Sequence, residues 1–149
     1  MDILKVKFEG VKTTIVYSES VDNGLIEKET TFKSDSERHP DFEDAGKELI
    51  PLALSLLGLP MDYKEGIEFR GVTFTINEHQ GMGACVTLLK YIDDINSPFV
   101  MNTPHTHNAE EGASIMPTAF RNQLQKLEKE ANAYLKGKRK QADMFADAA

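Results

Sequence analysis

The sequence predicts an α+β fold with a mainly antiparallel sheet, built from two halves that each contain a β-meander and a helix. Two observations support this fold class. Apolar and polar residues alternate over the first third of the chain and again after residue 65. This two-residue period is typical of β-strands. Each set is followed by apolar residues spaced three and four apart, the period of an amphipathic helix. The expected order is βββα-βββα, followed by a flexible C-terminal tail.

The first half begins with three predicted strands. Leu4, Val6 and Phe8 alternate with charged residues, and a second strand follows a turn near Gly10. The turn at 22–24, Asp-Asn-Gly, leads into a third strand. Short turns between successive strands predict an antiparallel meander.

A helix is expected after the polar loop 34–40. Acidic residues at 41–44 suit its first turn, Pro51 predicts a kink, and Gly58 predicts its end. The residues of its predicted buried face are Phe42, Ala45, Leu49, Leu52, Ala53 and Leu56.

The second half repeats this order. The alternation changes phase at Arg70-Gly71, which predicts a β-bulge. After a turn at Gln80-Gly81, residues 84–91 are apolar on both faces and predict a strand inside the sheet, followed by a short strand over 99–103.

The last helix is predicted to start near Pro117 and to run to Lys136. One apolar stripe requires a packing partner, either the sheet or a second copy of the chain, and the sheet is favoured because the stripe is short. A helix-mediated homodimer is the alternative. The stripe consists of Phe120, Leu124, Leu127, Ala131 and Tyr134.

With 149 residues, the chain predicts a single α+β domain over 1–136 and a tail over 137–149, basic first and acidic later. The segments 8–15 and 69–76 share Phe, Gly, Val, Thr and Ile at the same offsets, which suggests a duplication of 1–60 and 61–136. The chain enters a strand pattern directly and has no apolar run of membrane-spanning length, so we expect a cytoplasmic protein without a membrane partner.

The charge distribution disfavours strong nucleic-acid binding by the folded body. Four of the 17 Lys and Arg residues and two of the 24 Asp and Glu residues lie after residue 135. Residues 1–135 therefore hold 13 basic and 22 acidic side chains, a net charge of −9, which repels phosphate. The four late cations are candidates for a nucleic-acid contact, although cations around Gly137 also suit a helix C-terminus. They are Lys136, Lys138, Arg139 and Lys140.

The C-terminal tail carries one adjacent apolar pair, Met144 and Phe145, with Asp143 before it and Gln141 three residues before Met144. This segment resembles the peptide by which bacterial and phage replication and repair proteins dock on the DNA polymerase sliding clamp. The family pattern is Gln, two variable residues, Leu or Met, then Phe. The resemblance implies that Gln141 fills a polar subsite and that the apolar pair fills a hydrophobic groove. Met adapts to irregular pockets and Phe supplies contact area at low entropy cost.

Two features depart from the commonest form of that peptide: Ala142 stands where Leu is common, and Met144 replaces Leu. Both are expected to weaken docking without abolishing it. The alternative for this segment is a terminus whose Phe145 packs back on its own domain.

A second resemblance covers most of the chain. The Asn102-Thr103-Pro104-His105 sequence after a strand, the acidic linker, and the basic run before the Gln-x-x-Met-Phe tail are similar to small proteins of tailed bacteriophages and prophages. In that group the genes tend to lie among DNA replication and recombination functions. The resemblance implies replication or recombination proteins as further partners, but it names no activity.

We therefore expect a non-enzymatic accessory protein without a cofactor, and two alternatives remain. A metal-dependent hydrolase would use His105 and His107, which alternate near Glu110 and Glu111, although a solvated loop is favoured there. A single-stranded DNA-binding protein would need aromatic residues beside a basic groove on one sheet face. Its candidate residues are Tyr17, Phe69, Phe74 and Arg70.

Overall fold

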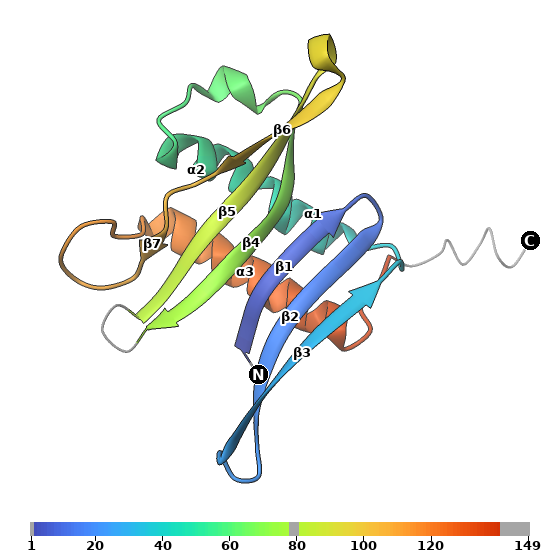
Figure 1. The fold of residues 1–149 in the computed structure, drawn as a ribbon, viewed down its shortest axis with the longest axis vertical. Helices are drawn as coiled ribbons and strands as arrows, with labels where there is room; N and C mark the ends of the chain where they lie inside the picture. The colour runs from blue at the N-terminus through green and yellow to red at the C-terminus, as the bar shows by residue number, and fades with distance from the viewer. Residues whose placement is uncertain (1, 78–80, 141–149) are drawn as a thin grey trace, which may run out of the picture.

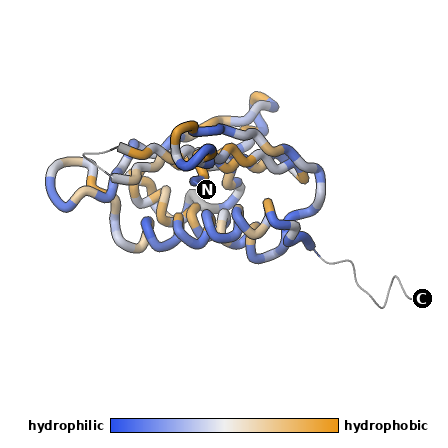
Figure 2. Tube along the Cα trace, turned by 90° about the horizontal axis from the view of Figure 1, so that it is seen from below, coloured by the Kyte–Doolittle hydropathy of each residue, from blue (hydrophilic) through white to orange (hydrophobic). Residues whose placement is uncertain are grey.

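The computed structural model describes residues 2–77 and 81–140, and over these residues it shows a seven-stranded sheet with helices on one face (Figure 1). Seen from below, the sheet and the described α-helices form two layers, with these helices on one side of the sheet (Figure 2). The predicted α+β class is confirmed. The elements are β1 (Asp2–Glu9), β2 (Lys12–Val21), β3 (Ile26–Ser34), α1 (Pro40–Lys47), α2 (Leu49–Leu56), η1 (Met61–Lys64), β4 (Ile67–Asn77), β5 (Gly81–Ile92), η2 (Asp93–Ile95), β6 (Ser97–Asn102), β7 (Thr106–His107) and α3 (Thr118–Leu135).

The strand order is β3-β2-β1-β4-β5-β6, and β7 pairs with β5 beyond the end of β6. The predicted meander of β1, β2 and β3 is confirmed, and the pairings between these named strands are antiparallel. The two halves meet where β1 pairs with β4, with Val6 opposite Val72. Residues 64 to 68 positions apart in the sequence thus lie side by side at the centre of the sheet.

The core lies between the sheet and the helices. Each residue of the predicted α3 stripe is at most 1 % exposed, so the stripe packs within its own chain as favoured. Tyr134 at the end of this stripe stacks edge-on against Phe32 of β3, with ring centroids 6.1 Å apart. The stripe is therefore covered by its own chain and is not available to a second copy.

The first helical segment breaks in a different place from the predicted one. We expected a kink at Pro51, but α1 ends at Lys47 and α2 starts at Leu49, with Glu48 between them. Proline lacks an N–H, and its ring collides with the carbonyl four residues earlier, here that of Lys47. The interruption therefore falls one turn before the proline, and Pro51 lies in the first turn of α2, where proline is tolerated.

Gly58 ends α2 as predicted. Its φ is +70°, its N–H donates to Ser55 O at 3.1 Å, and Leu59 N donates to Leu54 O at 2.9 Å. This pair of bonds is a Schellman motif, which satisfies carbonyls that the helix leaves open.

The predicted bulge in β4 is confirmed by a register shift between Phe69 and Gly71. A second shift, between Ile3 and Lys5 in β1, was not predicted. It places Ile3 in the core and leaves Leu4 half-buried, whereas the alternation had assigned Leu4 to the face of Val6.

The two similar segments take different places in the fold. Residues 8–15 cross the turn between β1 and β2, while residues 69–76 lie within β4. Three strands precede α1 and α2 in the first half, and four strands, β4 to β7, precede α3 in the second half. Of the predicted turn at Gln80-Gly81, Gln80 lies outside the described residues. Among the described helices, none has the length and apolar character needed to cross a membrane.

Candidate functional site

The C-terminal junction is the place where the folded body meets the predicted docking tail. Helix α3 ends at Leu135, and Gly137 reverses the chain with a φ of +108°. Gly137 N donates to Tyr134 O at 3.0 Å and Lys138 N donates to Ala133 O at 2.9 Å, a second Schellman motif. The prediction that Gly137 stops the helix is confirmed.

Three of the four cations in the basic run contact the body. Lys138 Nζ lies 3.0 Å from carboxylate oxygens of both Asp41 and Glu130. The bonds to Glu130 and then to Asp41 raise the pKa of Lys138, and Lys138 lowers the pKa of Asp41. The guanidinium of Arg139 lies 3.5 Å from the centre of the Tyr134 ring.

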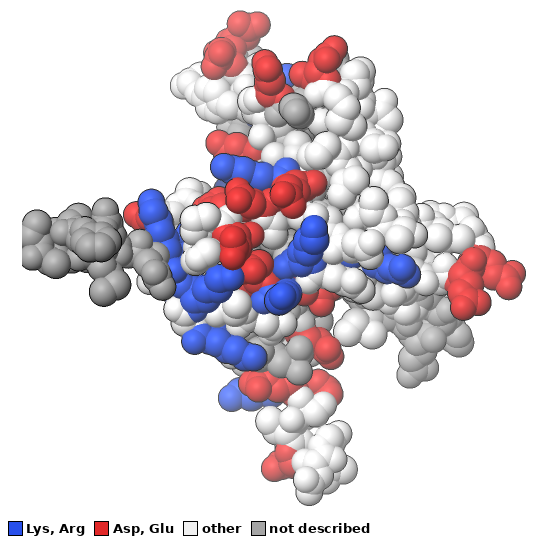
Figure 3. Space-filling model, turned by 180° about the vertical axis from the view of Figure 1, so that it is seen from behind, with Lys and Arg blue, Asp and Glu red and all other residues white. Residues whose placement is uncertain are grey.

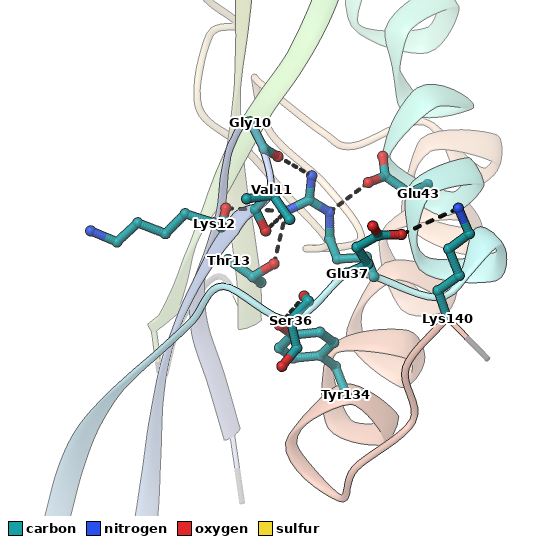
Figure 4. Close-up of polar contacts among 10 residues, drawn as sticks. Gly10, Val11, Lys12, Thr13, Ser36, Glu37, Glu43, Tyr134 and Lys140 are labelled. Carbon is teal, nitrogen blue, oxygen red and sulfur yellow. Dashed lines mark hydrogen bonds and ion pairs between the residues drawn. The ribbon is translucent and has the colours of Figure 1, made fainter. Parts of the chain in front are cut away.

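Lys140 forms the last contact along the described chain. Its Nζ lies 3.2 Å from Glu37 Oε2, and its N–H donates to Glu37 O at 3.1 Å (Figure 4). Lys136 is exposed at the helix end. Most of the positive charge proposed for a nucleic-acid contact is thus paired with the body's own carboxylates or stacked on its aromatic ring.

Arg38 fixes the loop that receives this run. Its guanidinium is buried and lies 3.9 Å from the centre of the Phe8 ring. Nη1 donates to Thr13 Oγ1 at 2.8 Å and to Lys12 O at 3.1 Å, and Nη2 donates to Gly10 O at 2.5 Å (Figure 4). Arg38 therefore satisfies the open carbonyls of the β1–β2 turn.

The same loop is held from the other side by α3. Tyr134 Oη donates to Ser36 O at 2.9 Å, and Nε of Arg38 donates to Glu43 of α1 at 2.8 Å. The point where the tail leaves the body is thereby fixed relative to β1, α1 and α3. Sequence reasoning missed Arg38, because one arginine in a polar loop gives no signal of burial.

A cleft of about 730 Å³ opens between helices α1 and α2 and the ends of β1 and β4. Its apolar surface comes from residues such as Phe8, Ile50 and Phe69, and five carboxylates line it against two cations, Arg38 and Lys47. Acidic and basic side chains are mixed over the helix-covered face, with acids gathered near its centre (Figure 3). This face disfavours a phosphate backbone, in agreement with the net charge of the body. The five acids are Glu43, Asp44, Glu48, Glu65 and Glu68.

The histidine segment is part of the sheet, which corrects the expectation of a solvated loop. Thr106 and His107 form β7 opposite Ala84 and Gly83 of β5, and His107 is buried. His107 Nδ1 accepts a bond from Ala109 N at 3.3 Å. Backbone bonds also join His107 to Ser114 and Met116. The sequence pattern could not reveal the pairing with β5, because Gly83 lies 24 residues before His107.

His105 and His107 line one small pocket with Glu111, but they make different contacts. His105 Nε2 lies 2.7 Å from Thr75 Oγ1, while His107 is buried beside β5. Within residues 2–77 and 81–140, no group of three or more His, Cys, Asp or Glu side chains is arranged to hold a metal ion. The described geometry thus offers the metal-dependent hydrolase alternative no ligand set.

The aromatic residues proposed for single-stranded DNA stacking lie on the wrong side of the sheet. Phe69 and Phe74 are buried in the core, and Tyr17 packs against it. Arg70 Nη1 donates to Phe8 O at 3.4 Å. Stacking requires exposed ring faces, so these residues do not form the platform that this alternative needs.

Comparison with known proteins adds no family assignment, since no protein-family model, curated protein or solved structure matches the chain.

Proposed function

We propose that this protein is a non-enzymatic accessory protein of phage or prophage DNA metabolism, which docks on the bacterial sliding clamp in the host cytoplasm. Gln141, Met144 and Phe145 are the docking residues, with Asp143 as a neighbouring contact. These residues lie outside the described part of the chain, and the observation that supports the proposal is where the described part ends. The first residue of the peptide follows Lys140 directly, and Lys140 is held to Glu37 by its side chain and its backbone.

This anchoring supports different roles for the basic run and the peptide. The cations at 138–140 contact side chains of the body. The clamp-binding pattern begins at the residue that follows them. Phe145 follows Lys140 by five residues in the sequence, and five residues of extended chain span at most about 18 Å. A clamp held by the peptide is therefore close to α1 and the loop around Glu37.

Docking has one of two consequences for replication. The body recruits another replication or recombination protein to the clamp, or the peptide occupies the groove and excludes host proteins. A short peptide of this kind is expected to bind with a Kd on the order of micromolar, about 8 kcal/mol. A clamp-dependent polymerase assay separates the two, since occlusion inhibits synthesis in the absence of any further phage protein.

The direct test is titration of purified bacterial sliding clamp with the full-length protein by calorimetry. We expect saturable binding that the Met144→Ala, Phe145→Ala double variant loses and that Gln141→Ala weakens. Asp147→Asn lies in the same tail outside the pattern and is the matched control, with unchanged affinity. Absence of binding at tens of micromolar clamp, or equal binding by the double variant, would refute the proposal.

A further inference from the structure

The two edges of the sheet differ in chemistry. The outer strand β3 carries charged side chains along its length, which protect an edge against pairing with another chain. The opposite outer strand, β6, reads Ser-Pro-Phe-Val-Met-Asn and has no charged residue. Phe99 and Val100 are 51 % and 52 % exposed and point to opposite faces of the strand. The charged residues of β3 are Glu27, Lys28, Glu29 and Lys33.

The hydrogen-bond pattern shows which backbone groups of β6 face outward. Thr103 N donates to Val86 O at 2.9 Å, which continues the register of β5 and β6. Pairs alternate along an antiparallel ladder, so Met101, Phe99 and Ser97 direct their polar groups toward β5. Pro98, Val100 and Asn102 direct theirs away from it. Proline at an outward position agrees with this, because no bond to β5 is lost there.

We propose that β6 pairs with β6 of a second copy of this chain, so that two sheets join into one continuous antiparallel sheet. In a register with a twofold axis at Val100, the two Val100 residues exchange N–H to carbonyl bonds. Asn102 N–H of each copy donates to Pro98 O of the other, opposite the residue that has no N–H. Pro98 cannot return a bond to Asn102, so each of these two symmetric pairs has one hydrogen bond instead of two.

Side chains on both faces match in the same register. Val100 meets its own copy on the open face of the sheet, beside Leu89, which is its cross-strand neighbour on β5. Phe99 meets Met101 of the second copy on the helix side, where both residues line a cavity with Leu59. Cross-strand apolar pairs of this kind stabilise sheets.

Electrostatics also permit a second copy at this edge. The paired strands bring no like charges opposite each other, because β6 is neutral. The acidic hairpin ends at Asp93 and Asp94 lie at opposite ends of the seam, because the two strands run antiparallel. The net charge of −7 on each chain repels over longer range, so dimerisation is expected to strengthen with salt. This surface is separate from the tail, and the inference does not depend on clamp docking.

The test is sedimentation velocity of the full-length protein from low to hundreds of micromolar, at physiological and at high salt. We expect a concentration-dependent dimer, weakened at least about tenfold by Val100→Lys, which places two cations opposite each other. Thr31→Lys on the exposed β3 edge adds the same charge and is expected to leave the dimer unchanged. Val100→Pro removes an outward N–H without removing a bond to β5, so it tests the edge even if the lysine variant misfolds.

Amide hydrogen exchange supplies a second readout. The Val100 and Asn102 amides are expected to slow as concentration rises, while the Met101 amide, bonded within the chain, stays protected throughout. A monomer at hundreds of micromolar in high salt overturns the proposal. A dimer that survives both Val100 variants, with exchange at Val100 unchanged, also overturns it.

Discussion

Nε of Arg38 donates a 2.8 Å hydrogen bond to Oε1 of Glu43, which joins a loop side chain with 5 % exposure to a carboxylate on α1. The other guanidinium nitrogens reach the β1–β2 turn. One side chain thus connects the first hairpin of the sheet to the first helix, beneath the point where the tail leaves the body.

Replacing Arg38 with Met is expected to destabilise the fold by about 1.5–3 kcal/mol, because buried Thr13 and the turn carbonyls lose a charged donor. Urea unfolding followed by circular dichroism measures the change. Arg121→Met removes a cation from α3 that is only half-buried, and it should shift stability by no more than about 0.5 kcal/mol. Similar losses for both variants would show that Arg38 does not hold the hairpin.

Gly71→Ala is expected to cost about 1–3 kcal/mol, because an added Cβ would collide with the backbone carbonyl of Val6 across the β1–β4 pairing. Backbone atoms in a paired strand cannot move aside as a flexible side chain can. Thr73→Ala, at an exposed position in the same strand, is the control. A Gly71→Ala protein with the thermal midpoint of the wild type would contradict the close approach of β1 and β4.

Glu128 on α3 is predicted to make the fold less stable as pH rises. Burial raises the pKa of its carboxyl above the ordinary value, with a smaller contribution from Asp2. A carboxyl with a raised folded-state pKa stabilises most when protonated, and that contribution is lost as pH rises through the raised value.

Glu128→Gln should therefore gain stability at about pH 7 and match the wild type near pH 4, as measured by thermal unfolding across pH. Glu130→Gln is the matched comparison on the same helix, since Glu130 bonds Lys138 at 3.0 Å. It should lose stability at neutral pH. A gain in both variants would point to general charge repulsion instead of burial at Glu128.

The body is expected to bind nucleic acid weakly. Lys138 and Lys140 are paired with carboxylates and Arg139 lies on Tyr134, so these three cations of the basic run already contact the body, and residues 1–135 carry a net charge of −9. Anisotropy of a labelled single-stranded oligonucleotide should show no saturable binding at low micromolar protein in physiological salt. Saturable, salt-sensitive binding that falls in a Lys138→Ala, Lys140→Ala variant would revive the nucleic-acid interpretation.

Local sequence patterns predicted much of the fold. The alternation in the first third predicted the meander, the change of phase predicted the bulge at Arg70-Gly71, and glycines predicted the ends of α2 and α3. Each of these features depends on neighbouring residues, whose spacing or φ preference is visible in the sequence. The break before Pro51 was placed one turn too late, because proline acts on the carbonyl four residues earlier.

Features that depend on distant contacts could not be predicted. The β1–β4 pairing places Val6 opposite Val72. Strand β7 pairs with β5 across a loop, and this pairing buries His107, which the sequence analysis had placed in a solvated loop. The stacking role suggested for Phe69 and Phe74 was wrong because a strand pattern shows that alternate residues share a face without showing which face the helices cover.

By itself, the sequence determined the fold class, the acidic body, the α3 stripe and the tail pattern at Gln141, Met144 and Phe145, since composition and short-range periodicity carry this information. Clamp docking by that tail stays a prediction from the same residues. The tertiary structure decided that the basic run contacts the body, that Arg38 holds the loop to which Lys140 binds, and that the uncharged strand β6 lies at the edge of the sheet. Those properties arise from which segments pack together, and burial and pairing exist only once the chain has folded.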